Sequence, residues 1–253
     1  MDKAAHIAVN SIKADKIRQI NLLHEMSNVS TVGFKKVFDI YSTTLRVDVE
    51  GTYGSRFLVT PAEINRVNLS PGSRITTNNE LDIFVEGEGV LGVFNQLGNI
   101  AFTRRGDLQV SPDGLLKTGD GFSVADDGGG EIRLATELEY RIAKDGGIYS
   151  MNADEEVAEP VFVAQLMLRD ASEITMEKME DGLFKPVGID AGDFTGGPKE
   201  VLVSNYALEG SSVKTYDVLT QMINSERAYE MKINIIKQLR ELEESSSSLL
   251  QTA

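Results

Sequence analysis

The chain has 253 residues, which is enough for one large domain or two modest ones. It carries 39 Asp and Glu residues against 25 Lys and Arg residues, a net charge of -14. Such an acidic chain is a poor partner for nucleic acid, because binding phosphates requires a basic surface. The absence of cysteine excludes disulfides, zinc–thiolate sites and a cysteine nucleophile.

Neither a cleaved secretion signal nor a membrane-spanning helix is expected. Asp2, Lys3 and His6 stand where the apolar run of a signal would begin. No run of about 18 uninterrupted apolar residues occurs, so we expect no direct insertion into a membrane. The sequence thus predicts a protein that is soluble or attached only through other proteins.

Glycine, proline and charge divide the chain into segments. All six prolines lie between Pro61 and Pro198, and 21 of the 23 glycines lie between Gly51 and Gly197. The acidity has a similar distribution, because residues 81–200 hold 24 Asp and Glu against 10 Lys and Arg. These limits predict an N-terminal helix and turn at 1–33, an extended β linker at 34–80, an acidic β domain at 81–200, and a return strand with a C-terminal helix at 201–253.

Both ends of the chain predict amphipathic helices. In the first, apolar residues recur on one side of a 3.6-residue helix, namely Ala5, Val9, Ile12, Ile20, Leu23 and Met26. In the second, a heptad-type spacing is kept by Leu219, Met222, Tyr229, Ile233 and Ile236. Other apolar residues, such as Leu22 and Ile223, lie off these stripes, so each helix needs several neighbours. An intramolecular two-helix hairpin and an intermolecular bundle, with these eleven residues at subunit interfaces, both satisfy the pattern.

The middle of the chain predicts antiparallel β structure. Short alternating runs are separated by turn sequences, for example Pro112-Asp113-Gly114 and Asp145-Gly146. The apolar run from Val161 to Arg169 predicts a buried central strand. The expected fold class is mixed: long N- and C-terminal α-helices that pack as a coiled-coil-like bundle, with a mainly antiparallel β central domain built as a barrel or sandwich.

No catalytic, cofactor-binding or metal-binding motif is present. The only two histidines, His6 and His24, do not form a zinc-protease pattern, and no nucleophile elbow or phosphate-binding loop occurs. The acidic turns do not match the spacing of a calcium-binding EF-hand loop. Lys35-Lys36 and Arg104-Arg105 are interpreted as solvated charges beside turns. We therefore expect no enzyme, no cofactor and no metal.

Two terminal segments carry a family resemblance. Residues 28–35, NVSTVGFK, and residues 208–237, which contain LEGSSV and INSERAYEMKINIIK, resemble the terminal signatures of the flagellar rod and hook proteins. The matching positions are Asn28, Thr31, Gly33, Phe34 and Lys35 in the first segment, and Glu209, Gly210, Ser211 and Val213 in the second. Ser212 stands where the family usually has Asn. Residues 78–91, 103–121 and 181–188 also resemble the central domain of proximal rod members.

The resemblance implies a structural subunit of the bacterial flagellar basal body. It implies a proximal rod protein in the periplasm, exported through the flagellar channel without a cleaved signal, that transmits torque to the hook. The implied partners are other proximal and distal rod subunits and neighbouring basal-body components. A distal rod or hook-type paralogue is the alternative within the family. From the residues alone, a β-domain hydrolase of cell-wall glycan or an adhesin on a helical stalk also remains open.

Overall fold

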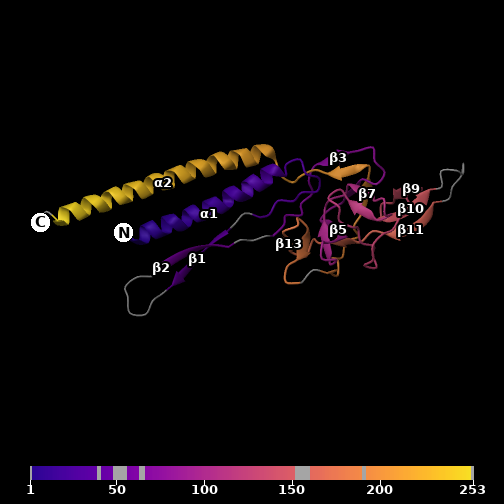
Figure 1. The fold of residues 1–253 in the computed structure, drawn as a ribbon. Coiled ribbons are helices and arrows are strands. Elements are labelled where there is room, and N and C mark those ends of the chain that lie inside the picture. Colours follow the sequence, from indigo (N-terminus) through magenta and orange to yellow (C-terminus); the bar gives the residue numbers. More distant parts are fainter. Residues whose placement is uncertain are drawn as a thin grey trace. The chain divides into compact units, whose positions relative to one another are not determined.

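A computed structural model describes residues 2–38, 41–47, 56–62, 66–151, 160–189 and 192–251 of the chain (Figure 1). The chain divides into two compact units. We call the first the helical unit, which comprises Met1–Ser27, Asp39–Ile64 and Lys214–Ala253. The second is the β unit, which comprises Asn28–Phe38 and Asn65–Val213. Within the described residues, no helix has the length and apolar character needed to cross a membrane.

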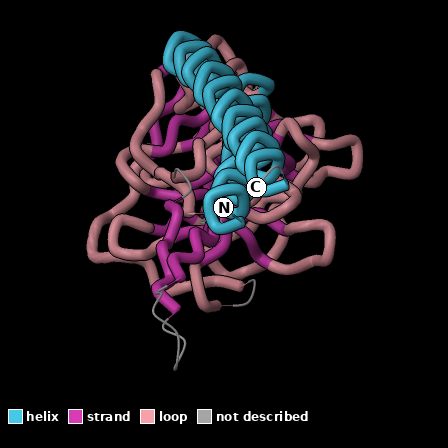
Figure 2. Tube along the Cα trace, turned by 90° about the vertical axis from the view of Figure 1, so that its left-hand side faces the viewer, coloured by secondary structure: helices cyan, strands magenta, loops and turns pink. Residues whose placement is uncertain are grey.

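The helical unit contains two helices and a hairpin. Helix α1 spans Asp2–Ser27 and helix α2 spans Thr215–Gln251, and neither contains a glycine or proline that would break it. The two helices lie side by side and run in opposite directions, as Figures 1 and 2 show. Strands β1 (Tyr41–Val47) and β2 (Arg56–Ala62) pair antiparallel, and β2 also contacts α1.

The β unit is built from short antiparallel strands that form several small sheets. The central sheet has the order β12-β5-β6-β14-β13, and a second has the order β11-β10-β9. Three further pairs are β15-β4, β16-β3 and β7-β8. The strands are β3 (Arg74–Thr76), β4 (Ile83–Val85), β5 (Gly89–Phe94), β6 (Ile100–Thr103), β7 (Leu108–Val110), β8 (Leu116–Thr118), β9 (Glu139–Ile142), β10 (Gly147–Met151), β11 (Val161–Gln165), β12 (Leu168–Asp170), β13 (Met176–Lys178), β14 (Phe184–Pro186), β15 (Val203–Asn205) and β16 (Ala207–Glu209).

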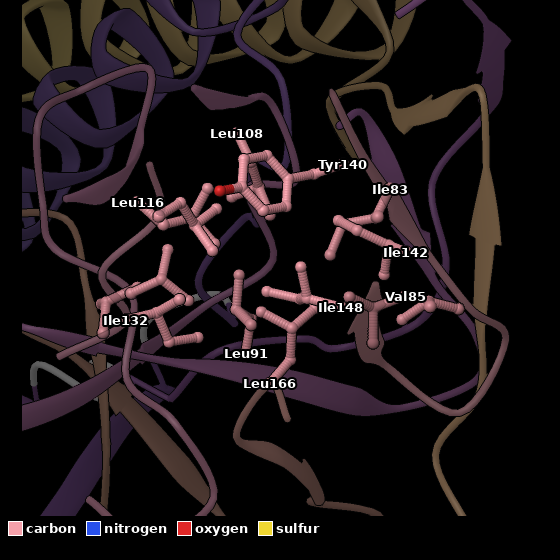
Figure 3. Close-up of a cluster of buried hydrophobic side chains, with 14 of the residues drawn as sticks. Ile83, Val85, Leu91, Leu108, Leu116, Ile132, Tyr140, Ile142, Ile148 and Leu166 are labelled. Atoms are coloured by element: carbon pink, nitrogen blue, oxygen red, sulfur yellow. The ribbon is translucent and has the colours of Figure 1, made fainter. Parts of the chain in front are cut away.

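Two hydrophobic clusters form the core of the β unit. The larger is drawn in Figure 3 and joins side chains from most of the sheets, among them Ile83, Leu91, Leu116, Ile142 and Ile148, all without solvent exposure. The smaller cluster surrounds Phe102, whose ring meets Phe194 edge to face at 4.8 Å between centroids. Strands from residues 83 to 203 contribute to the larger cluster, so it joins parts of the β unit that are far apart in the sequence.

Both predicted hairpins of the β unit are confirmed. Strands β7 and β8 pair antiparallel across the turn that contains Gly114, whose φ is 77°. Strands β9 and β10 pair across the turn that contains Gly146, whose φ is 85°. Both backbone conformations lie in the left-handed region, which is why these Asp-Gly sequences are reliable turn signals.

The predicted fold class was wrong. The described residues form sixteen strands and two helices, so most of the elements are strands, and only the C-terminal helix, with 37 residues, exceeds thirty. The two helices make a single pair and not a coiled-coil-like bundle. The central strands form open sheets and not a closed barrel. Apolar periodicity shows that a helix has faces to cover, but it does not specify the covering elements, and this is why the bundle was overpredicted.

The interpretation of residues 161–169 as one buried central strand was also wrong. The run forms two strands, and β11 lies at the edge of its sheet. Val161 and Phe162 are 57% and 55% exposed, whereas Leu166 and Met167 are buried. A continuous apolar run indicates a preference for burial but does not distinguish a central strand from an edge strand.

Candidate assembly site

The two helices carry the residues that the sequence assigns to subunit interfaces. Four of them are well exposed: Ile20 at 56%, Leu23 at 49%, Leu219 at 44% and Tyr229 at 41%. Ile12, Met26, Met222, Ile233 and Ile236 are half-buried, and the side chains of Ala5 and Val9 lie outside those described. The helix side chains that are fully buried, among those described, are Leu22 and Val218, both off the predicted stripes. The interface assignment itself stays a prediction.

Polar contacts join the two helices along their common side. Lys232 forms an ion pair with Asp15, and the amide of Gln19 donates a hydrogen bond of 2.6 Å to a carboxylate oxygen of Glu226. Next to them is a cavity of about 300 Å³, lined by polar residues of both helices such as Arg18 and Asn224. The contact between the helices is therefore partly polar.

In the β unit, the two family-like turn segments from opposite ends of the chain lie against each other. The backbone N–H of Gly33 donates a hydrogen bond of 2.7 Å to the carbonyl of Glu209. The N–H of Ser212 donates to the carbonyl of Phe34 at 2.9 Å, and the Ser212 hydroxyl accepts from the N–H of Lys36 at 2.9 Å. The segments 28–36 and 209–213 are thus held by main-chain bonds in addition to side chains.

Short polar side chains shape each of these turns locally. The Thr31 hydroxyl donates to the side-chain oxygen of Asn28 at 3.1 Å, and the hydroxyl of Ser211 accepts from the N–H of Val213 at 3.2 Å. The N–H of Gly210 donates to the carbonyl of Ser73 at 2.7 Å. Such local hydrogen bonds stabilise the turn that ends a helix or strand, because the side chain replaces the hydrogen-bond partner that the backbone loses there.

Glu209 lies at the centre of a buried ionic group, which we call the junction cluster and define as Lys35, Arg104 and Glu209. Its Oε1 accepts hydrogen bonds from Lys35 Nζ at 2.7 Å and from the N–H of Gly72 at 2.5 Å. Its Oε2 accepts from Arg104 Nε at 2.7 Å. The three side chains have no exposure to solvent. The fold therefore pairs one carboxylate with two cations in a dry interior.

The other donors of the two cations are satisfied by backbone carbonyls. Arg104 Nη1 donates to the carbonyls of Gly87 and Gly89, at 2.9 and 2.6 Å, and Nη2 donates to that of Val85 at 2.8 Å. Lys35 Nζ also donates to the carbonyl of Ser70 at 2.6 Å. Burial of charge is tolerated only when such partners are present.

The interpretation of Lys35 and Arg104 as solvated charges was wrong. They are 1% and 0% exposed. Their neighbours behave differently, because Lys36 is half-buried and Arg105 pairs with Asp107 at a partly exposed position. The family-like turn segments include both Lys35 and Glu209, so they marked these residues as notable. They did not indicate that the two side chains pair. Arg104 lies in the family-like segment 103–121, but that resemblance does not indicate burial.

Burial and ion pairing act in opposite directions on Glu209. Burial raises the pKa of this carboxyl, but the hydrogen bond and charge of Arg104, the charge of Lys35 and the N–H of Gly72 outweigh it, so the pKa lies below its usual range. Burial lowers the pKa of Lys35, and the charge of Glu209 partly offsets that effect. The contact with the Arg104 guanidinium thus favours the ionised form of Glu209.

This lowered pKa predicts a stability that depends on acid pH. Because the unfolded Glu209 takes up a proton at about pH 4.3 and the folded one only at lower pH, the free energy of unfolding should fall as pH drops below about 5. Urea denaturation between about pH 5 and about pH 3 measures this slope. The slope should be smaller in Glu209→Gln than in the natural chain, whereas Asp170→Asn, which removes another carboxyl of lowered pKa, should retain the Glu209 part. Equal slopes in Glu209→Gln and the natural chain would contradict the assignment.

A large cleft of the β unit does not resemble an acid–base site. It has a volume of about 810 Å³ and is lined by Asp127, Arg169, Asp170 and Asp193, among others. Arg169 bridges Asp127 and Asp193 at 2.6 and 2.9 Å. The pKa of Asp170 is lowered by hydrogen bonds from Ser172 in spite of burial, which is the reverse of what a general acid needs. Among the described residues, no group of three His, Cys, Asp or Glu side chains is arranged to hold a metal ion.

Two family models of flagellar hook and rod proteins match separate parts of the chain. The family described as "Flagellar hook protein FlgE/F/G D1 domain" matches residues 84–150, and the one described as "Flagellar basal body rod FlgEFG protein C-terminal" matches residues 204–249. The first range contains Arg104 and the second contains Glu209. The junction cluster therefore joins the two matched regions.

Relatives that match over nearly the full length are rod proteins. The flagellar basal-body rod protein FlgF of Salmonella typhimurium is 29% identical over 254 residues, which cover 99% of each chain. FlgF of Escherichia coli is 29% identical over 93% of each chain, and the rod protein FlgG of Caulobacter vibrioides is 25% identical over 98% of this chain and 99% of its own. Nearly the whole chain is thus similar to the FlgE/F/G flagellar hook and rod proteins, and these matches support a structural subunit of the basal-body rod that resembles FlgF.

Proposed function

We propose that the chain forms the proximal part of the flagellar rod, the role that its resemblance to FlgF implies. The observation that carries this assignment is the 29% identity to FlgF over 99% of both chains. A distal rod role is the alternative, because FlgG proteins match over nearly as much of the chain at 23–28% identity. In this proposal the four sequence segments act as helix, linker, β domain and returning helix.

Assembly takes place through the helical unit. Apolar side chains remain exposed on both helices, including Ile20, Ile223, Met231, Ile235 and Leu242, each more than half exposed. Exposed apolar side chains on a subunit of an assembly favour burial against neighbours. The partners are adjacent proximal and distal rod subunits and neighbouring basal-body components, and the subunit works in the periplasm after export through the flagellar channel. It acts mechanically, by passing torque between its β unit and its helices, without catalytic turnover or a cofactor.

Genetic complementation tests this role and its alternative. A strain that lacks FlgF should fail to swim and should regain swimming when it carries the natural chain. A strain that lacks FlgG should not be rescued. Rescue of the FlgG-deficient strain alone would assign the chain to the distal rod, and rescue of neither strain would contradict the rod assignment.

The helical interface is tested by adding one carboxylate to α2. Ile233→Asp places a charge at a half-buried apolar position, and burying it unpaired between subunits costs several kcal/mol, so we expect fewer than about one tenth of cells to swim. Asn234→Asp adds the same charge at the next, exposed position and should leave swimming unchanged. Circular dichroism of both purified variants checks that the β unit remains folded. Normal swimming of Ile233→Asp would mean that this face of α2 is not an interface.

A further inference from the structure

We propose that Glu209 is a positioning residue that fixes both ends of the β unit to its core, so that a load on either end enters the core through the junction cluster. The segment 28–38 follows α1 in the sequence, and the segment 209–213 precedes α2. Both belong to the β unit. The mechanical meaning of this inference rests on the proposed rod function, but the structural role of Glu209 can be tested without it.

Glu209 contacts each segment that must be held. Its carbonyl accepts from Gly33, and its carboxylate accepts from Lys35, two residues later in the same turn. The carboxylate also accepts from the N–H of Gly72, just before β3, which pairs with β16. Its remaining oxygen accepts from Arg104 at the end of β6. One residue therefore connects the start, the middle and the end of the β unit.

Arg104 extends this connection into the hydrophobic core. The carbonyls that it binds belong to the last residue of β4, the following turn and the first residue of β5. Strand β5 lies inside the five-stranded sheet, and the side chain of Val85 belongs to the larger core cluster. A displacement of Glu209 would thus break its bond to Arg104, which is itself bonded to strands β4 and β5.

The charged character of the cluster favours a role in positioning over one in stability. A buried ion group of this kind contributes little more stability than an apolar group of the same volume, because desolvation offsets the attraction. Apolar contacts, however, tolerate sliding and repacking, whereas two cations and one carboxylate are satisfied in a single arrangement. The cluster therefore specifies how the two end segments meet.

Glycines allow the backbones to approach closely around the cluster. A Cβ atom on Gly72 would come within 2.4 Å of the carbonyl oxygen of Gly210. A Cβ atom on Gly210 would come within 2.4 Å of the hydroxyl oxygen of Ser73. The segment 209–213 consequently packs closely against Gly72 and Ser73, which leaves it little freedom to move while Glu209 is in place.

Hydrogen exchange of the purified full-length chain tests the inference. In Glu209→Gln, two buried cations lose their counter-charge, so the amides of Gly33 and Gly72 should exchange at least about tenfold faster than in the natural chain. The amides of Leu116 and Val124, which are bonded within the core, should keep their exchange rates. The Gly33 amide is informative because it binds the backbone of Glu209 and not its carboxylate. Unchanged exchange at Gly33 would overturn the proposal.

Two further variants keep the test decisive. Glu177→Gln removes an ion pair with Lys185 at a partly exposed position, and it should change the exchange rate of neither the Gly33 nor the Gly72 amide.

The double variant Lys35→Met/Glu209→Gln removes one cation together with the carboxylate. The net charge of the cluster then stays as in the natural chain, so this variant should fold even if Glu209→Gln does not. We expect fast exchange at Gly33 in this double variant and loss of swimming in complemented cells. Slow exchange at Gly33 would mean that Glu209 only neutralises charge, and it would overturn the proposal. Failure of the natural chain to restore swimming would contradict only the rod function.

Discussion

Gly33→Ala should lower the free energy of unfolding of the β unit by roughly 2 to 5 kcal/mol. Gly33 has a φ of 67°, a conformation that costs a residue with a side chain about 1 to 2 kcal/mol. A Cβ atom there would also lie 2.6 Å from the backbone of Arg104 and of Arg105, so one of the two segments must move at a cost of about 1 to 3 kcal/mol. For a unit of this size, the two effects lower the melting temperature by roughly 5 to 15 °C.

Gly98→Ala is the matched control for Gly33→Ala. Gly98 has a φ of 78°, but no heavy atom lies within 4 Å of the place where a Cβ would stand. This variant therefore measures the backbone conformation without the close contact, and we expect a loss of about 1 to 2 kcal/mol. Thermal unfolding of the two variants gives the comparison. Equal melting temperatures would mean that the turn does not pack on Arg104 and Arg105 as described.

Arg104→Met should have the other large effect on stability, about 3 to 5 kcal/mol in the free energy of unfolding. The substitution retains an unbranched apolar side chain but removes all the donors. Three backbone carbonyls, those of Val85, Gly87 and Gly89, then lose a partner in the interior. Glu209 retains only Lys35 and the N–H of Gly72 as partners.

The neighbouring arginine provides the control for Arg104→Met. Arg105 forms an ion pair with Asp107, with side chains 23% and 24% exposed, so Arg105→Met should cost less than about 1 kcal/mol. Urea denaturation followed by circular dichroism measures both variants. If the two substitutions destabilise the chain equally, the distinction between a buried and a partly solvated arginine in this Arg-Arg pair is incorrect.

Some features of the β unit were predictable because they depend on local sequence. The turns at Gly114 and Gly146 require a left-handed conformation that an Asp-Gly sequence adopts readily, so both hairpins followed from the sequence. The edge position of β11 did not. Whether Val161 lies inside or at the edge of a sheet depends on strands far away in the chain, and no local pattern records that order.

The candidate assembly site shows the same limit. Lys35 and Glu209 were both recognised within the family motifs, yet they are separated by 174 positions, and their contact is a property of the folded chain. Arg104 precedes Arg105 with identical chemistry, and only the path of the backbone at the end of β6 directs the first inward. For the helices, periodicity located apolar faces, but it did not indicate that Leu22 and Val218 are buried, because the pairing of the helices is not encoded by spacing alone.

The hydrogen bond between the N–H of Ser212 and the carbonyl of Phe34 has an evolutionary consequence. It places the first entry of the chain into the β unit and its last exit side by side, although the chain also leaves the unit after Phe38 and returns at Asn65. The loops of the segment Asn65–Val213 can therefore grow or shrink while these two ends stay together. Lineages that need subunits of different girth could thus diversify this segment while the terminal helices keep a common plan.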